Sequence, residues 1–146
     1  MAVDGWTAQP HIEQIMLSGG AGVVHANDQA NLIGGNATRA NAIIGAGGDD
    51  TIFGSAFADT LTGGAGNDVL YSQGGADHFV YAAPGWGYDQ IAGFTPGAAK
   101  LDFRGSGISF GQLTLNSAGG NTQVEFGGSA ILLHGVAALG AGDFLF

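Results

Sequence analysis

The chain has 146 residues, enough for one domain with a modest hydrophobic core. Its 12 acidic residues outnumber its 3 basic ones and give a net charge of −9, which excludes nucleic acid as a partner because phosphate contacts need a basic surface. Hydrophobic residues make up 45% of the chain, which argues against disorder, and its 29 glycines follow no strict three-residue period, which excludes collagen.

The sequence also predicts that the protein does not insert into a membrane, because it has no run of about 18 apolar residues. The opening MAVDGWTAQP has neither the basic region nor the apolar stretch of an N-terminal secretory signal. The count of 0 cysteines rules out disulfides, zinc–thiolate sites and cysteine nucleophiles. This composition fits a protein that is exported without an oxidative folding step.

Residues 1–16 are expected to form a leader strand and linker from a larger parent protein, with the strand in HIEQIMLSG (11–19). HIEQI differs from the zinc-protease motif H-E-x-x-H, because Glu13 stands two places after His11 and Ile15 occupies the second histidine position. We therefore expect these residues to be structural.

Residues 17–44 contain weak repeats of a nine-residue unit whose eighth place is apolar. ANDQANLIG (26–34) has Asn31 in the sixth place, and GNATRANAII (35–44), which is one residue longer, has Asn41 there. Asparagines at such places favour turns in which the side chain bonds the backbone locally. Whether these two turns also bind metal stays open at this point.

Residues 45–81 contain the same unit in regular form: GAGGDDTIF, GSAFADTLT, GGAGNDVLY and SQGGADHFV follow one another without a gap. The sixth place is always aspartate (Asp50, Asp59, Asp68, Asp77), and the eighth place is always large and apolar (Ile52, Leu61, Leu70, Phe79). Glycine permits the backbone conformations of tight turns, and aspartate beside exposed carbonyls suggests a hard cation.

Each unit is predicted to form a six-residue turn followed by a three-residue strand, so that two units make one coil of a flattened parallel solenoid. Residues 18 apart then stack, and the eighth places alternate between two stacks that face one core. One stack is expected to contain Val24, Ile43, Leu61 and Phe79, and the other Ile33, Ile52 and Leu70.

Residues 82–146 are predicted to form a small antiparallel β cap. QLTLN (112–116), TQVEF (122–126) and AILLH (130–134) read as short strands, with SAGGN (117–121) as a hairpin loop. APGWGYD (83–89) breaks the nine-residue register and is predicted to be a loop. Trp6, Trp86 and Tyr88 are the large flat side chains outside the core pattern, and two interpretations of them stay open, a platform for a sugar ring and a hydrophobic plug on the last coil.

GGAGNDVLY matches G-G-x-G-x-D-x-U-x, the calcium-binding RTX (hemolysin-type) nonapeptide, at every specified place. The units at 45–80 therefore resemble this family. They differ from it at five places where the family has glycine and this chain has Ala46, Ser55, Phe57, Ser72 and Gln73. Downstream, YDQIAGFTPGAAKLDF (88–103) resembles the C-terminal module of serralysin-type secreted metalloproteases, with Gly93 and Ala99 where that family has acids. The resemblance implies an all-β, calcium-bound parallel β-roll.

The resemblance also implies ligand sets for two calcium ions, because carbonyls at places one and three of one turn and two and four of the next join the aspartates. The first set is Gly45, Gly47, Asp50, Gly64, Gly66 and Asp68, and the second is Gly54, Ala56, Asp59, Gln73, Gly75 and Asp77. A third ion would use Asn41 on one side of the roll or Asp89 beyond Asp68.

The function expected from this resemblance is that of a non-catalytic calcium-binding module of a secreted bacterial protein, accessory to a larger secreted enzyme. The ending GDFLF resembles the uncleaved C-terminal signal read by type I secretion machinery, and it also reads as an edge strand. The alternative function is a polysaccharide-binding module beside a carbohydrate-active enzyme.

Overall fold

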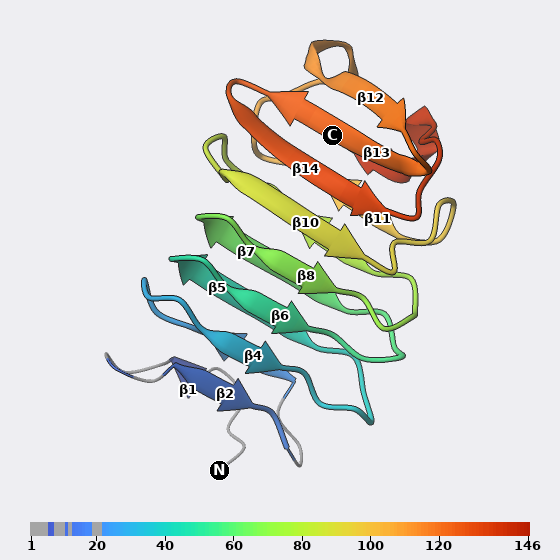
Figure 1. The fold of residues 1–146 in the computed structure, drawn as a ribbon. Helices are drawn as coiled ribbons and strands as arrows, with labels where there is room; N and C mark the ends of the chain where they lie inside the picture. The colour runs from blue at the N-terminus through green and yellow to red at the C-terminus, as the bar shows by residue number, and fades with distance from the viewer. Residues whose placement is uncertain (1–5, 8–10, 12, 19–21) are drawn as a thin grey trace.

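The structure, a computed structural model, describes residues 6–7, 11, 13–18 and 22–146. In this part of the chain two β-sheets face each other across one core, and successive coils stack along a single axis (Figure 1). The predicted all-β parallel roll is confirmed. Among the described residues, no helix is long and apolar enough to cross a membrane. Residues 1–5 and 8–10 of the expected leader, and Ile12 and Gly19 of its predicted strand, lie outside the described residues.

One sheet contains seven strands, and all of its neighbours pair in parallel. In spatial order they are β1 (Trp6–Thr7), β3 (Val23–His25), β5 (Ala42–Gly47), β7 (Thr60–Ala65), β9 (His78–Val80), β11 (Lys100–Asp102) and β15 (Phe144–Leu145).

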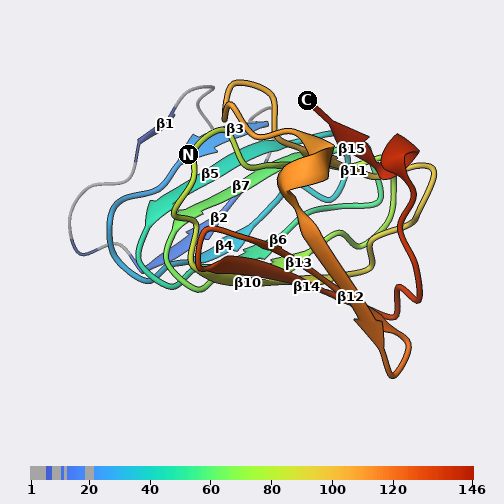
Figure 2. The same cartoon turned by 90° about the horizontal axis from the view of Figure 1, so that it is seen from above.

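The other sheet contains eight strands and lies across the core from the first (Figure 2). In spatial order they are β2 (Gln14–Met16), β4 (Leu32–Gly34), β6 (Thr51–Phe53), β8 (Val69–Tyr71), β10 (Tyr88–Ala92), β14 (Ser129–His134), β13 (Asn121–Phe126) and β12 (Thr114–Ala118). Two short 3-10 helices, η1 (Phe110–Gln112) and η2 (Ala141–Asp143), lie near the C-terminal end.

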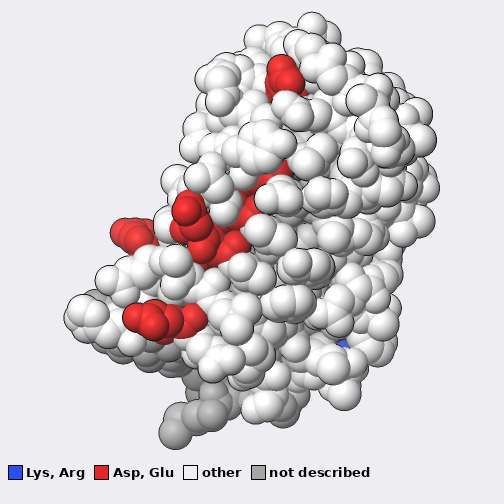
Figure 3. Space-filling model, viewed as in Figure 1, with Lys and Arg blue, Asp and Glu red and all other residues white. Residues whose placement is uncertain are grey.

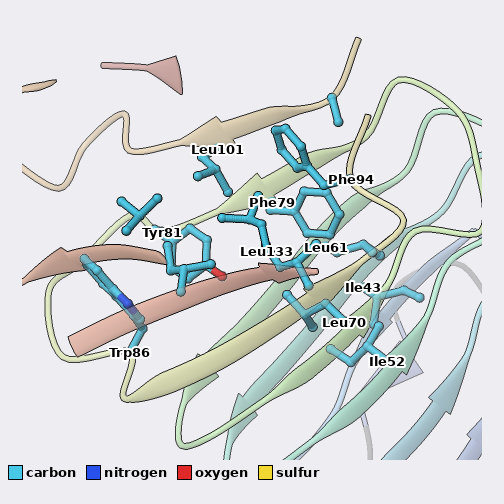
Figure 4. Packing of buried hydrophobic residues seen from close by; sticks show 14 of the residues in the cluster. Ile43, Ile52, Leu61, Leu70, Phe79, Tyr81, Trp86, Phe94, Leu101 and Leu133 are labelled. Atoms are coloured by element: carbon cyan, nitrogen blue, oxygen red, sulfur yellow. The ribbon is translucent and has the colours of Figure 1, made fainter. Parts of the chain in front are cut away.

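The two predicted core stacks are confirmed by the strand register. Leu61 lies opposite Ile43 on one side and Phe79 on the other, and Ile52 lies between Ile33 and Leu70. All six side chains are at most 1% exposed. The five of them that Figure 4 labels point into the space between the sheets. Because alternate residues of a strand face opposite sides, each three-residue strand buries one large side chain.

The parallel roll continues into the segment predicted to be a cap. β10 pairs with β8, and β11 pairs with β9, so residues 88–102 add a further coil. β14 and β15 then extend the two sheets in parallel. The antiparallel part consists of β12, β13 and β14, and the predicted hairpin turns at Gly119 and Gly120, whose φ angles of +59° and +79° favour glycine.

Aromatic rings close the C-terminal end of the core. Trp86 is only 2% exposed and packs against Tyr81, Phe103 and Phe126, with ring centroids 5.2, 5.7 and 6.3 Å away. Tyr81 and Trp86 lie together beyond the aliphatic stacks (Figure 4). Of the two interpretations of this tryptophan, the structure supports the hydrophobic plug.

The turns between the sheets form two edges of the roll, which are named here for use below. The first edge contains the turns that lead from the seven-stranded to the eight-stranded sheet, at 26–31, 45–50, 63–68 and 81–89. The second edge contains the return turns at 35–41, 54–59 and 72–77. The predicted metal ligands lie on these two edges.

Candidate metal centre

Aspartates of successive coils are linked by hydrogen bonds along the first edge. The backbone N–H of Asn31 donates to Asp50 Oδ1 (2.8 Å), that of Asp50 to Asp68 Oδ1 (2.8 Å), and that of Asp68 to Asp89 Oδ1 (3.0 Å). Each carboxylate therefore spans two coils and is held in one orientation. The predicted stacking of turn 45–50 on turn 63–68 is confirmed.

The second carboxylate oxygen of each aspartate in this ladder has no hydrogen-bond partner. Oδ2 of Asp50, Asp68 and Asp89 is buried and receives no hydrogen bond. The three residues are only 1%, 1% and 0% exposed, respectively. A buried carboxylate oxygen without a donor is costly unless something neutralises it, so these atoms call for a cation.

A small space lined by oxygen atoms adjoins the Asp50 carboxylate. A Cβ atom on Gly45 would clash with both Asp50 Oδ2 and the Gly63 carbonyl oxygen, so these two oxygens converge where any side chain would stand. Carboxylate and carbonyl oxygens are the ligands that calcium prefers. The residues of the first edge therefore fit a calcium ion between turns 45–50 and 63–68.

The irregular turn 81–89 returns to the register of the repeats before it reaches Asp89. Asn67 N–H donates to Asp49 Oδ1 (2.8 Å), and in the next coil Tyr88 N–H donates to Asn67 Oδ1 in the same way (3.0 Å). Asp89 thus follows Asp68 in the ladder although it lies 21 residues further on, where the regular step from Asp50 is 18. The three additional residues are accommodated earlier in the turn.

Burial dominates the ionisation of the first-edge carboxyls. It raises the pKa of Asp50 from 3.8 to about 7, and the charges of Asp68 and Asp49 add to this effect. It raises the pKa of Asp89 from 3.8 to about 8, again with a contribution from Asp68. The pKa of Asp68 is raised for the same reason. Without a cation, these carboxyls therefore keep their protons to a higher pH in the folded chain than in the unfolded chain.

The second edge has the same aspartate ladder, but donors occupy its outer oxygens. Asp59 N–H donates to Asp77 Oδ1 (2.8 Å), as on the first edge. Asp59 Oδ2, however, accepts from the backbone N–H and the hydroxyl of Ser55 (2.6 and 3.0 Å), and Asp77 Oδ2 accepts from the Ser72 hydroxyl.

An asparagine amide occupies the next place on the second edge. Asn41 Nδ2 donates to Asp59 Oδ1 (2.8 Å) and to the backbone carbonyls of Asn36 and Arg39 (3.2 and 3.0 Å). A single NH₂ group thus contacts one carboxylate and two carbonyls, which are the oxygen types of a calcium site. The predicted local bonding of the Asn41 side chain to the backbone is confirmed, whereas the serine contacts with the aspartates were not predicted. The one indication of these contacts in the sequence was that serine stands at two places where the repeat has glycine.

The structure thus brings the predicted ligands of each set to neighbouring turns of one edge. Within the described residues, no three His, Cys, Asp or Glu side chains form a metal-binding cluster, so the predicted sites depend on main-chain carbonyls for most of their ligands. Acidic atoms are visible along the edge where β5 and β7 lead into β6 and β8 (Figure 3). His78 Nδ1 lies 3.7 Å from Asp102 Oδ2 and forms an ion pair with it when the histidine is protonated.

The raised pKa values predict how calcium-free protein responds to pH. A carboxyl whose pKa is higher in the folded chain stabilises the fold below its unfolded value, near 4, and this contribution is lost as the pH rises to about 7 or 8. We expect the urea midpoint of chelator-treated protein, measured by circular dichroism, to fall as the pH rises from 4.5 towards 7.5, where the chain is expected to be largely unfolded without calcium. Asp50→Asn should flatten this dependence. A midpoint that rises with pH would contradict the prediction.

Comparison with known proteins agrees with this geometry. The family model for the RTX calcium-binding nonapeptide repeat matches residues 44–79, in 4 copies. The extracellular lipase LipA from Serratia marcescens has a similar structure, with a TM-score of 0.66 and 22% sequence identity over 86% of this chain and 21% of the lipase. At this identity the likeness shows the fold, and the chain spans about a fifth of the lipase's length.

A second solved structure is the AlgE6R3 subunit of the Azotobacter vinelandii mannuronan C5-epimerase. It aligns at 23% identity over 95% of this chain and 86% of that one, with a TM-score of 0.31, too low for a structural argument. A search of curated proteins found no match. The family match and the roll geometry agree on the central coils. The chain therefore carries a block of RTX calcium-binding nonapeptide repeats, residues 44–79, within a parallel β-roll.

Proposed function

We propose that this chain is the calcium-dependent folding module of a secreted bacterial protein. The repeat block is a non-catalytic calcium-binding unit. The observation that carries the proposal is the row of buried first-edge Oδ2 atoms without partners, at Asp50, Asp68 and Asp89. When bound, calcium supplies the positive charge that these oxygens lack.

The chain's own residues both make the fold depend on a cation and provide the oxygens that would bind it. The aspartate ladder places like charges on neighbouring coils in a buried edge, where repulsion between them is weakly screened. The core between the sheets is thin, because each strand contributes one large side chain. At neutral pH without calcium, charge repulsion therefore opposes a modest hydrophobic gain, and the fold depends on the ion.

A calcium titration followed by far-UV circular dichroism tests the proposed function. In chelator at pH 7.5 we expect a largely unfolded spectrum, and in millimolar calcium a β spectrum, since extracellular calcium modules bind in the range of about 10⁻⁴ to 10⁻³ M. Magnesium at the same concentration is the control, because it demands octahedral geometry and retains its waters. A full β spectrum in chelator that calcium leaves unchanged would refute the proposal.

The proposed route of export uses the C-terminal segment GDFLF. Asp143 holds this segment on the roll, since its Oδ1 accepts from Gly97 N–H (2.6 Å) and its Oδ2 from Gly140 N–H (2.8 Å). Phe144 is buried and pairs with Leu101 in the neighbouring strand, so the segment also forms an edge strand. Both interpretations of the ending hold together in this proposal.

Deleting residues 142–146 is expected to abolish secretion by a type I system while calcium binding at Asp50 and Asp68 is retained. The removed strand pairs with β11 at the end of the seven-stranded sheet, and β9 and β11 separate it from β7, which leads into turn 63–68. Protein in the culture medium and in the cells would be measured by immunoblot, beside calcium binding of the purified variant. Unchanged secretion of the shortened chain would exclude the segment as the export signal.

A polysaccharide-binding role is the second candidate, and it rests on one exposed aromatic residue. Tyr88 is 42% exposed beside a hollow of about 370 Å³ that Gln123 and Glu125 also line. A flat ring next to polar side chains is suited to stacking on a sugar. Electrophoresis in polysaccharide gels would show retardation that Tyr88→Ala removes. Equal mobility with and without polysaccharide would exclude this role.

A further inference from the structure

We propose that calcium binds along the first edge alone, between Asp50 and Asp68 and between Asp68 and Asp89, and that side-chain donors replace the ion along the second edge. This inference rests on the proposed function and specifies where its ions lie. It departs from the regular repeat pattern, which assigns one ion to each edge.

The two edges differ in one property, the state of the outer aspartate oxygen. On the first edge, Oδ2 of all three aspartates is buried and without a donor. On the second edge, Oδ2 of both aspartates accepts a serine hydroxyl, and Asp59 Oδ2 also accepts a backbone N–H. The ladder bonds to Oδ1 are alike on both edges, so the difference lies in the donors that reach Oδ2.

The difference follows from substitutions in the turns. A glycine stands beside an aspartate Oδ2 on both edges, Gly45 at Asp50 and Gly54 at Asp59, so the difference comes from the other positions of the turns. On the second edge, Ser55 and Ser72 stand at glycine places of the repeat and direct hydroxyl groups at the corresponding oxygens. A hydroxyl donor supplies in part the positive charge that an ion would supply, and it fills the same space.

The stacked turns at 35–41 and 54–59 show the same replacement more fully. Asn41 Nδ2 bonds Asp59 Oδ1 and two backbone carbonyls, and the Ser55 hydroxyl also reaches the Arg39 carbonyl (3.2 Å). These carbonyls and this carboxylate are already satisfied by protein donors. A cation there would have to displace those bonds, which opposes binding.

The site between Asp68 and Asp89 gains support from Tyr81. Its hydroxyl is buried and has no hydrogen-bond partner. Gly87 also approaches the Gly66 carbonyl so closely that a Cβ atom would clash with that oxygen. Two unpartnered carboxylate oxygens, a carbonyl and a phenol thus lie around turns 63–68 and 81–89, which are in register.

Two matched variants test this inference by isothermal titration with calcium at pH 7.5. Asp77→Asn keeps both hydrogen bonds of this side chain, because Oδ1 still accepts from Asp59 N–H and the new amide can donate to the Ser72 hydroxyl. It should bind as many ions as the unchanged protein, with affinity within about twofold. Asp50→Asn should lose one ion, because it removes a charged ligand whose oxygen has no protein donor.

Loss of an ion, or a roughly tenfold loss of affinity, in Asp77→Asn would overturn the inference, as would an unchanged number of ions in Asp50→Asn. No calcium binding by the unchanged protein would instead refute the proposed function. If Asp50→Asn fails to fold, anomalous diffraction from calcium-bound crystals of the unchanged protein decides. Ions between Asp50 and Asp68 and between Asp68 and Asp89 are expected, and an ion between Asp59 and Asp77 would overturn the inference.

Discussion

Replacing Asp68 with asparagine is expected to remove calcium-dependent folding over the concentration range in which the unchanged protein folds. Asp68 lies between the coils of Asp50 and Asp89 in the first-edge ladder, so both proposed ions would lose a charged ligand. We expect each ion to bind roughly tenfold more weakly or worse, which corresponds to a loss of about 1.4 kcal/mol of binding free energy. The calcium midpoint, measured by circular dichroism at pH 7.5, should rise accordingly.

Asp49→Asn is the matched control for this variant. Asp49 lies on the same edge but is exposed, and its Oδ1 accepts from Asn67 N–H, a bond that an asparagine oxygen also accepts. It removes the same charge from the chain and should shift the midpoint little. Equal shifts for the two variants would mean that net charge, and not the first-edge ladder, governs the response to calcium.

Leu61→Asp is expected to unfold the roll even in saturating calcium. Leu61 is 0% exposed, with Ile43 and Phe79 above and below it in the stack. A carboxylate there has no donor and replaces the one large side chain that its strand contributes to the core. The cost, on the order of 4–5 kcal/mol or more, is comparable to the total stability of a small domain. Urea denaturation in calcium would measure it.

Thr62→Asp, one place further along the same strand, tests the assigned facing. Thr62 is half-buried and lies on the outer side of β7, because alternate residues of a strand face opposite sides. Its substitution should cost about 1 kcal/mol or less, as is usual for surface positions. If both variants lost the same stability, the assignment of the eighth places to the core would be wrong.

The sequence alone predicted the regular part of the roll because its period is short and local. A nine-residue unit with an apolar eighth place leaves one arrangement in which every eighth-place side chain is buried. The register of Leu61 with Ile43 follows from the step of 18 residues. The sixth-place aspartates predicted a hard cation for the same reason, since stacking brings Asp50 beside Asp68.

The state of the aspartate oxygens was decided by the tertiary structure. Asp50 and Asp59 occupy the same place of the repeat, yet Oδ2 of the first has no donor and that of the second accepts from Ser55. A repeat pattern records which residues recur, whereas a hydrogen bond depends on where a side chain points in the folded turn. Serine at a glycine place was visible in the sequence, but its partner was not.

The C-terminal third also depended on long-range pairing. β14 joins the roll by pairing in parallel with β10, and Ile131 lies opposite Asp89, 42 residues earlier in the chain. No period connects these segments, because the loops between them vary in length and composition. The sequence by itself determined the repeating coils, their core and the cation they call for. The tertiary structure alone decided which edge offers unpartnered oxygens, because that choice depends on where the Ser55 and Ser72 hydroxyls point in the folded turns.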